Sequence, residues 1–151
     1  MYSFRSAEAT DADAVAQLVD AAYRHYVERI GMMPGPMLED YARVIRSSKV
    51  HVAERGESLA GVLVLDINDE GFVIENVAVH PSERGKGLGM LLLQRAEAEA
   101  RRAGFDSIYL YTHEHMSENL ELYAKIGYVE YDRRSQGTFS LVFMRKALPP
   151  T

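Results

Sequence analysis

The sequence contains no cysteine among its 151 residues. The chain therefore has no disulfide bonds, no thiolate ligands for a metal and no enzyme thiol that could carry an acyl group. Long apolar runs are also missing, because the longest, at residues 59–65, is interrupted by Gly61 and is far too short to cross a bilayer. The N-terminal residues lack the charged-then-apolar layout of a secretory signal. We therefore expect a cytoplasmic protein.

An excess of positive charge is absent as well. The chain has 17 Lys and Arg against 22 Asp and Glu, for a formal net charge of −5. This balance argues against nucleic acid or an anionic membrane as a partner, and it would tolerate a cationic substrate. The length suits one domain with a hydrophobic core, so we predict a single domain over residues 1–151.

Three alternating glycines stand where an apolar strand end, at residues 77–81, gives way to an amphipathic helix. A helix start offers unpaired backbone N–H groups and a partial positive charge, and glycine lets a phosphate approach the backbone closely. Arg84 and Lys86 add positive charge at the same place. The pattern predicts a cradle for a diphosphate. The glycines are Gly85, Gly87 and Gly89.

Two common phosphate-binding loops fit this stretch poorly. A P-loop continues from Gly-Lys to Ser or Thr, but Lys86 is followed by Gly87, which leaves no hydroxyl for magnesium. A Rossmann loop needs its third glycine at Met90, whereas Gly89 comes one residue early. Asp106 stands near the distance of a ribose-binding acidic residue, but it precedes its expected strand. A nucleotide-binding module is therefore a poor fit.

The spacing Arg84-x-x-Gly87-x-Gly89 after a Val-Ala-Val-x-Pro strand end resembles the acyl-coenzyme A signature of the GNAT superfamily of N-acetyltransferases. Residues 119–128 resemble the family's later Asn-x-x-x-Tyr-x-x-x-Gly-Phe/Tyr segment, and the two motifs stand the expected distance apart. From residue 72 onward the order of expected elements follows the family, while residues 1–71 match only in outline.

Apolar periodicity and turn residues predict the elements of the fold. The fold class is α/β (α+β), with a mixed, mostly antiparallel sheet, helices on both faces and one splayed parallel strand pair. Expected helices lie at about 12–23, 38–46, 88–104 and 117–127, with Ser117 as a cap and a shaped loop over 24–37. Expected strands lie at 50–54, 59–67, 72–79, 107–112, 128–133 and 138–146, with a turn at 135–137 and with 72–79 beside 107–112 as the parallel pair.

The resemblance implies acetyl-coenzyme A as co-substrate. Its diphosphate would face the amides of residues 84–90, and its amide-bearing arm would pair with the main chain of Val77 and Val79. Asn119 and Tyr123 would face its reactive end. The implied cofactor residues are Val77, Val79, Arg84, Gly85, Lys86, Gly87, Leu88, Gly89, Met90, Asn119 and Tyr123.

Direct acyl transfer requires an oxyanion donor, an acid and a base. A backbone N–H near Val77 is the expected donor. Tyr123 is the expected acid because a phenol, with an ordinary pKa of about 10, is protonated at neutral pH and can protonate a departing thiolate. Asn119, four residues earlier, shares its helix face. The alternative is that Tyr123 is a half-buried aromatic and Asn119 a helix-start residue.

Glu75 is the candidate base, acting directly or through water. It departs from the family pattern, in which some members have a glutamate where this chain has Val73. Binding of a cationic substrate, or simple solvation, is as plausible a role for Glu75, and water alone is an alternative base.

We expect the acceptor site at the loop 24–37 and near the hairpin at 133–138. Arg29 would bind a substrate carboxylate or form a surface ion pair. The expected substrate residues are Tyr26, Arg29, Met37 and Glu75, within a wider set of wall candidates that adds Tyr23, Met33 and Tyr41. His113 and His115 predict no metal site, because no third ligand accompanies them.

These observations predict an acetyl-coenzyme A-dependent N-acetyltransferase that acts on a primary amine of a small molecule or peptide. The alternative is a non-catalytic acyl-coenzyme A sensor that regulates a partner. We expect no metal, no nucleic acid and no membrane partner. An apolar edge on the last hairpin favours a homodimer.

Overall fold

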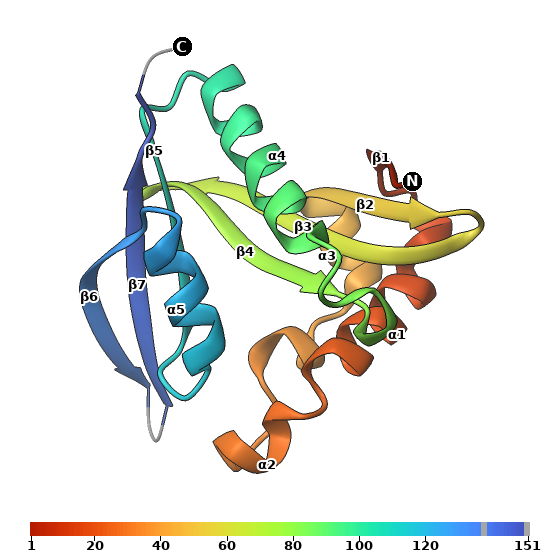
Figure 1. Cartoon of the computed structure of the whole chain (residues 1–151), viewed down its shortest axis with the longest axis horizontal. Helices are drawn as coiled ribbons and strands as arrows, with labels where there is room; N and C mark the ends of the chain where they lie inside the picture. The colour runs from red at the N-terminus through yellow and green to blue at the C-terminus, as the bar shows by residue number, and fades with distance from the viewer. Residues whose placement is uncertain (137–138, 150–151) are drawn as a thin grey trace.

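A computed structural model describes residues 1–136 and 139–149, whose seven strands form one sheet in the order β1-β2-β3-β4-β5-β7-β6 (Figure 1). The strands are β1 (Ser3–Ser6), β2 (Lys49–Arg55), β3 (Ser58–Asn68), β4 (Gly71–Val79), β5 (Ser107–His113), β6 (Val129–Gln136) and β7 (Phe139–Ala147). The helices are α1 (Ala12–Tyr23), α2 (Tyr26–Ile30), α3 (Tyr41–Ser47), α4 (Leu88–Arg102) and α5 (Ser117–Lys125), with 3-10 turns at Ala9–Asp11, Gly35–Leu38 and Pro81–Glu83.

Strand β3 explains why helices cover both faces of the sheet. Its successive side chains point to opposite faces, and both sets are apolar and buried. Val62 and Val64 pack in the core that includes α1, whereas Leu63 and Leu65 pack in the core that includes α4. Two cores therefore hold α1 and α4 on opposite faces of the sheet (Figure 1).

The parallel pair β4–β5 is joined over a short stretch. Val73 pairs with Tyr109 and Ile74 with Leu110, while the other neighbouring strands are antiparallel. Beyond these pairs β4 and β5 diverge (Figure 1). In the β3–β4 register a bulge leaves Glu75 unmatched between two paired positions of β4. The sheet thus opens at its centre, with Glu75 at the base of the opening.

The predicted fold class is confirmed, and the differences are local. The sequence reading missed β1, and it treated 24–37 as a loop although α2 lies within it. Helix α3 begins at Tyr41 rather than at residue 38, because the Asp40 side chain caps it by accepting the backbone N–H of Ala42. Ser117 does not cap α5, since it is the first helical residue.

Two predicted features fall at the edge of what is described. Gly137 and Thr138, predicted to form the end of the hairpin turn and the start of its second strand, lie outside the described residues. Within the described residues, no helix combines the length and apolar character needed to span a membrane.

Candidate active site

Two cavities meet where β4 and β5 diverge. The turn cavity, about 380 Å³, lies against residues 83–85 and 87–89, Val77 and Val79. The loop cavity, about 250 Å³, lies against residues 34–36 and the facing sides of β4 and β5. The residues that line both cavities are Tyr23, Val77, Asn119 and Tyr123. We call these four the junction residues, because a molecule in one cavity would meet a molecule in the other beside them.

The backbone between Pro81–Glu83 and α4 turns sharply at two glycines. Gly85 and Gly87 have φ of 79° and 83°, a left-handed conformation that side chains rarely adopt, and a Cβ at either would meet no atom within 4 Å. The backbone N–H groups of Gly85, Lys86 and Gly87 have no hydrogen-bond acceptor among the described residues. The first N–H groups of α4 also lack intrahelical partners. A row of unpaired amides therefore borders the turn cavity.

The predicted charges of this turn have protein partners. The Arg84 guanidinium donates to the carbonyl of Ala22 at 2.9 Å and ties the turn to α1, while Lys86 Nζ lies 3.6 Å from Glu83. Burial, together with the charge of Arg84, lowers the pKa of His25. Of the predicted cofactor residues, all line the turn cavity except Lys86 and Met90.

The main chain of β4 faces the gap at alternate residues. The N–H of His80 donates to the carbonyl of Ala60 on β3 at 2.8 Å. Because main-chain groups alternate sides along a strand, those of Val77 and Val79 point away from β3 and toward the diverging side. The Tyr23 hydroxyl lies 3.4 Å from the Val77 carbonyl. An extended, amide-bearing molecule in the turn cavity would find a strand edge there.

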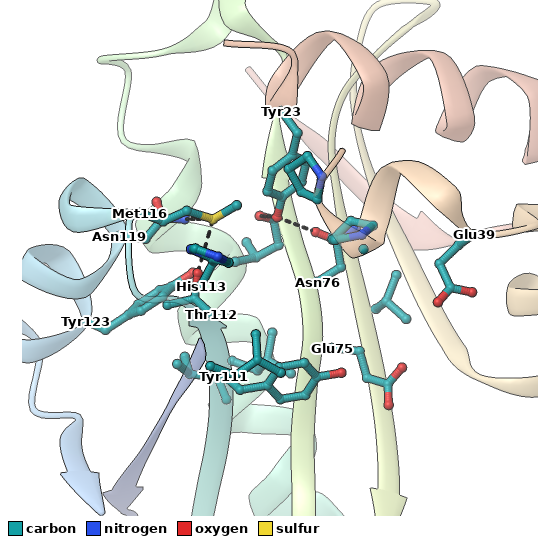
Figure 2. A pocket seen from close by; sticks show the side chains of 18 of the residues that line it. Tyr23, Glu39, Glu75, Asn76, Tyr111, Thr112, His113, Met116, Asn119 and Tyr123 are labelled. Atoms are coloured by element: carbon teal, nitrogen blue, oxygen red, sulfur yellow. Dashed lines mark hydrogen bonds between the residues drawn. The ribbon is translucent and has the colours of Figure 1, made fainter. Parts of the chain in front are cut away.

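Tyr123 occupies the junction from α5. Its side chain is 6% exposed, and its hydroxyl has no hydrogen-bond partner among the described residues. Burial raises the pKa of Tyr123, so the phenol is protonated across the neutral range. Asn119 lies one helical turn away, and its amide donates to the sulfur of Met116 at 3.7 Å (Figure 2). The junction thus holds an unpartnered hydroxyl donor beside an anchored amide.

A chain of hydrogen bonds fixes the wall of the loop cavity. The Tyr23 hydroxyl donates to Asn76 Oδ1 at 2.7 Å, Asn76 Nδ2 donates to the Tyr41 hydroxyl at 3.2 Å, and Tyr41 donates to the carbonyl of Pro36 at 2.6 Å. Burial raises the pKa of both tyrosines, so the chain carries no charge. It ties the loop after α2 to the central strand β4.

Carboxylates line the other side of the loop cavity. Glu75 and Glu39 lie opposite Tyr123 and Asn119 in Figure 2. Burial, and then the negative charges of Asp66 and Glu39, raise the pKa of Glu75. Burial, with the charge of Glu75, raises the pKa of Tyr111 to about 12.

His113 lines the loop cavity at the end of β5. Its Nδ1 accepts the backbone N–H of His115 at 3.0 Å, so the neutral ring carries its proton on Nε2. Burial and the neighbouring His115 lower the pKa of His113, which keeps it neutral. Among the described residues no group of three His, Cys, Asp or Glu could hold a metal ion.

The predicted substrate residues divide between two places. Glu75 lines the loop cavity, whereas Tyr26, Arg29 and Met37 do not. Tyr26 lines the turn cavity and donates to Glu118 at 2.8 Å, and Arg29 forms an ion pair with the same carboxylate at 2.6 Å. This placement does not fit the prediction that Arg29 binds a substrate carboxylate. Arg29 lies outside the loop cavity, and Glu118 already neutralises its charge.

Met37 packs in the core beside α1, and the wall candidate Met33 does not line the loop cavity, whereas Tyr23 and Tyr41 do. The sequence reading missed other lining residues, because they stand in separate segments with no motif. These are Glu39, Asn76, Tyr111, Thr112, His113 and Met116.

Comparison with known proteins places these features in a family. The sequence matches the acetyltransferase (GNAT) family over residues 13–128. The IAA acetyltransferase of Azospirillum brasilense is 29% identical over 142 residues, which cover 90% of this chain and 92% of that protein.

Two solved structures share the fold. The paia N-acetyltransferase of Thermoplasma acidophilum, in complex with coenzyme A, matches with a TM-score of 0.79 and 18% identity over 97% of this chain and 99% of that chain. The yncA structure of Salmonella typhimurium, with its cofactor acetyl-CoA, matches with a TM-score of 0.72 and 22% identity over 99% of this chain and 95% of that chain.

Proposed function

Because this chain belongs to the acetyltransferase (GNAT) family, we propose that it transfers the acetyl group of acetyl-coenzyme A directly to a primary amine of a small molecule or peptide. Family membership makes it an acyltransferase that uses acetyl-coenzyme A. The amine acceptor and the residue roles are the proposal. The observation that carries it is the meeting of two cavities at the junction residues.

The turn cavity is the proposed site of acetyl-coenzyme A. Its diphosphate would accept hydrogen bonds from the unpaired amides at residues 85–89, where the start of α4 adds a partial positive charge. Its amide-bearing arm would run along the main chain of Val77 and Val79 toward the junction. The left-handed glycines leave this side of the turn open, which supports the assignment.

Transfer would take place at the junction. The nitrogen of a neutral amine forms a bond to the thioester carbon, and the carbon–sulfur bond breaks. A backbone N–H near Val77 would stabilise the negative charge that develops on the thioester oxygen. Tyr123 would donate its proton to the departing sulfur, because its hydroxyl has no partner among the described residues and burial keeps it protonated.

Glu75 is proposed to take the ammonium proton through water, because it lies across the loop cavity from Tyr123 at the junction. Its raised pKa brings the carboxylate closer to the neutral range, where a base is most effective. Water alone is the competing base. A pH profile of kcat for the wild type and for Glu75→Gln separates the two, since only a Glu75 base makes the acidic limb of the profile depend on this residue.

The direct test is release of free thiol from acetyl-coenzyme A in the presence of a panel of primary amines. Turnover with at least one amine supports the proposal. Binding of coenzyme A without turnover on any amine would favour the alternative of a non-catalytic acyl-coenzyme A sensor.

A single domain, a cytoplasmic location and a homodimer stay predictions. The homodimer is supported by the edge position of β6, where Val129 is 68% and Tyr131 41% exposed. Light scattering of the purified protein measures its mass in solution and tests this point.

A further inference from the structure

The loop cavity has one acidic side without a counter-charge. Glu39 and Glu75 both line it, and Asp66 on β3 lies close enough to raise the pKa of Glu75. Within the described residues neither Glu39 nor Glu75 forms an ion pair, although many other carboxylates of the chain do. Glu39 is exposed, whereas Glu75 is half-buried, and a half-buried carboxylate without a cation is unfavourable because it has lost part of its hydration and is repelled by the neighbouring negative charges.

The opposite side of the same cavity offers a different kind of group. The Tyr123 hydroxyl, on a side chain more than nine-tenths buried, borders the cavity without a partner among the described residues. Figure 2 shows it across the cavity from Glu39 and Glu75. Apolar side chains complete the walls between the two ends, among them Val64, Ile74 and Leu110.

A molecule that fits this cavity has a short apolar middle and two polar ends. The end at the junction must be the reacting amine, because the junction is where the turn cavity opens. The end at Glu39 and Glu75 must be positive to offset the two carboxylates. An acceptor with a carboxylate at that end would be repelled.

We propose that the acceptor is a dication, a small diamine whose second ammonium group is held by Glu39 and Glu75 while its first amine reacts at the junction. This inference rests on the proposed function and narrows its substrate class. Glu39 is a specificity-determining residue under this proposal, since it touches the end of the acceptor that does not react.

The first experiment compares three acceptors that share a four-carbon chain. These are 1,4-diaminobutane, 1-aminobutane and 4-aminobutanoate, in a thiol-release assay with acetyl-coenzyme A. We expect kcat/KM to be at least about tenfold higher for the diamine than for the monoamine, and lowest for the amino acid. Equal values for the diamine and the monoamine would overturn the inference but leave the acetyltransferase proposal intact.

The second experiment assigns the preference to the carboxylates. Glu39→Gln should raise KM for 1,4-diaminobutane roughly fivefold and change KM for 1-aminobutane much less, because only the diamine reaches this residue with a positive charge. Glu57→Gln, in the exposed turn between β2 and β3, is the matched control and should change neither. A preference for the diamine that survives Glu39→Gln and Glu75→Gln together would contradict the assignment.

Glu75→Gln separates recognition from base catalysis. A cation-binding role raises KM for the diamine, whereas a base role lowers kcat for both amines equally. Calorimetric titration of 1,4-diaminobutane into the coenzyme A complex tests the inference without turnover. If the diamine binds and Glu39→Gln weakens this binding, the diamine inference is supported even when no amine is acetylated. A lack of acetylation with every amine would contradict only the proposed function. Equal binding of 1-aminobutane and 1,4-diaminobutane would contradict the diamine inference.

Discussion

The turn cavity and the loop cavity meet at four residues, yet they are built in different ways. Half of the residues that line the turn cavity belong to one continuous stretch, from Val77 to Gly89, and this stretch offers main-chain amides. The loop cavity is assembled from α1, the loop after α2, α3, four strands and α5, and it offers side chains. Main-chain recognition suits a co-substrate that never changes, whereas side-chain recognition can be altered one residue at a time.

This contrast explains where specificity lies. The unpaired amides of residues 85–87 would bind a phosphate through backbone groups that no substitution removes, provided that the glycines keep the turn. Glu39 and Glu75, by contrast, would define the acceptor by charge. We therefore expect changes in the turn cavity to alter co-substrate binding and changes in the loop cavity to alter the choice of amine.

The largest effect is expected at the junction itself. Tyr123→Phe should lower kcat roughly a thousandfold, within the usual range for loss of a general acid, and leave coenzyme A binding nearly unchanged. Tyr128→Phe is the matched control, because Tyr128 is 2% exposed beside Tyr123 and its hydroxyl also has no partner among the described residues, but it lines neither cavity. Similar activity of the two variants would remove Tyr123 from the chemistry.

The next effect breaks the turn cavity alone. Gly87→Val should weaken coenzyme A binding roughly tenfold to a hundredfold, because the new side chain stands at the amides and costs one or two charge-assisted hydrogen bonds. Calorimetry measures the binding. Gly56→Val adds the same side chain at another left-handed glycine, with φ of 64° in the turn after β2, and should cost stability without affecting binding. Equal binding of coenzyme A by the two variants would contradict a diphosphate site at this turn.

A smaller effect concerns stability and pH. Burial, first, and then Asp66 and Glu39 raise the pKa of Glu75 above its ordinary value of 4.5. The folded state therefore binds this proton more tightly than the unfolded chain, so stability is lost as pH rises from 4.5 through the raised pKa. Glu75→Gln should raise the Tm by about 1–3 °C at pH 7.5, with the gain fading below pH 4.

Thermal unfolding across this pH range checks that expectation. Glu57→Gln, on the exposed turn after β2, should show no comparable gain. A lower Tm for Glu75→Gln at pH 7.5 would mean that Glu75 has a stabilising partner rather than an uncompensated charge.

The smallest effect is expected outside both sites of chemistry. Arg29 pairs with Glu118 at an exposed position, and exposed ion pairs contribute little, so Arg29→Ala should change kcat/KM less than about twofold. Steady-state kinetics with the preferred amine measures this. A large rise in KM would return Arg29 to the acceptor site and would blur the division between the two cavities.

The sequence predicted most of the fold, because the apolar alternation of β3 and the periodicity of α1 and α4 are strong local signals. It also predicted the turn cavity, since the strand end, the glycines and the helix follow one another in the chain. Short elements escaped it: β1 and α2 are held by tertiary contacts rather than by local patterning.

The loop cavity could be predicted only in part. Glu75 was predicted because it stands two residues from Val77 on the strand expected at 72–79. Glu39 and His113 carry no local signal, and they line one cavity only because the 3-10 turn at Gly35–Leu38 and the end of β5 reach the same opening. Arg29 and Met37 were expected there because the cofactor motifs leave their loop unused, but the short helix α2 directs Arg29 to Glu118.

A crystal structure with coenzyme A bound tests the central claim most directly. The account predicts the diphosphate on the amides of residues 85–89, the arm along Val77 and Val79, and the sulfur beside Tyr123. Coenzyme A seated elsewhere, with the amides of the turn bonded by the protein itself, would contradict it.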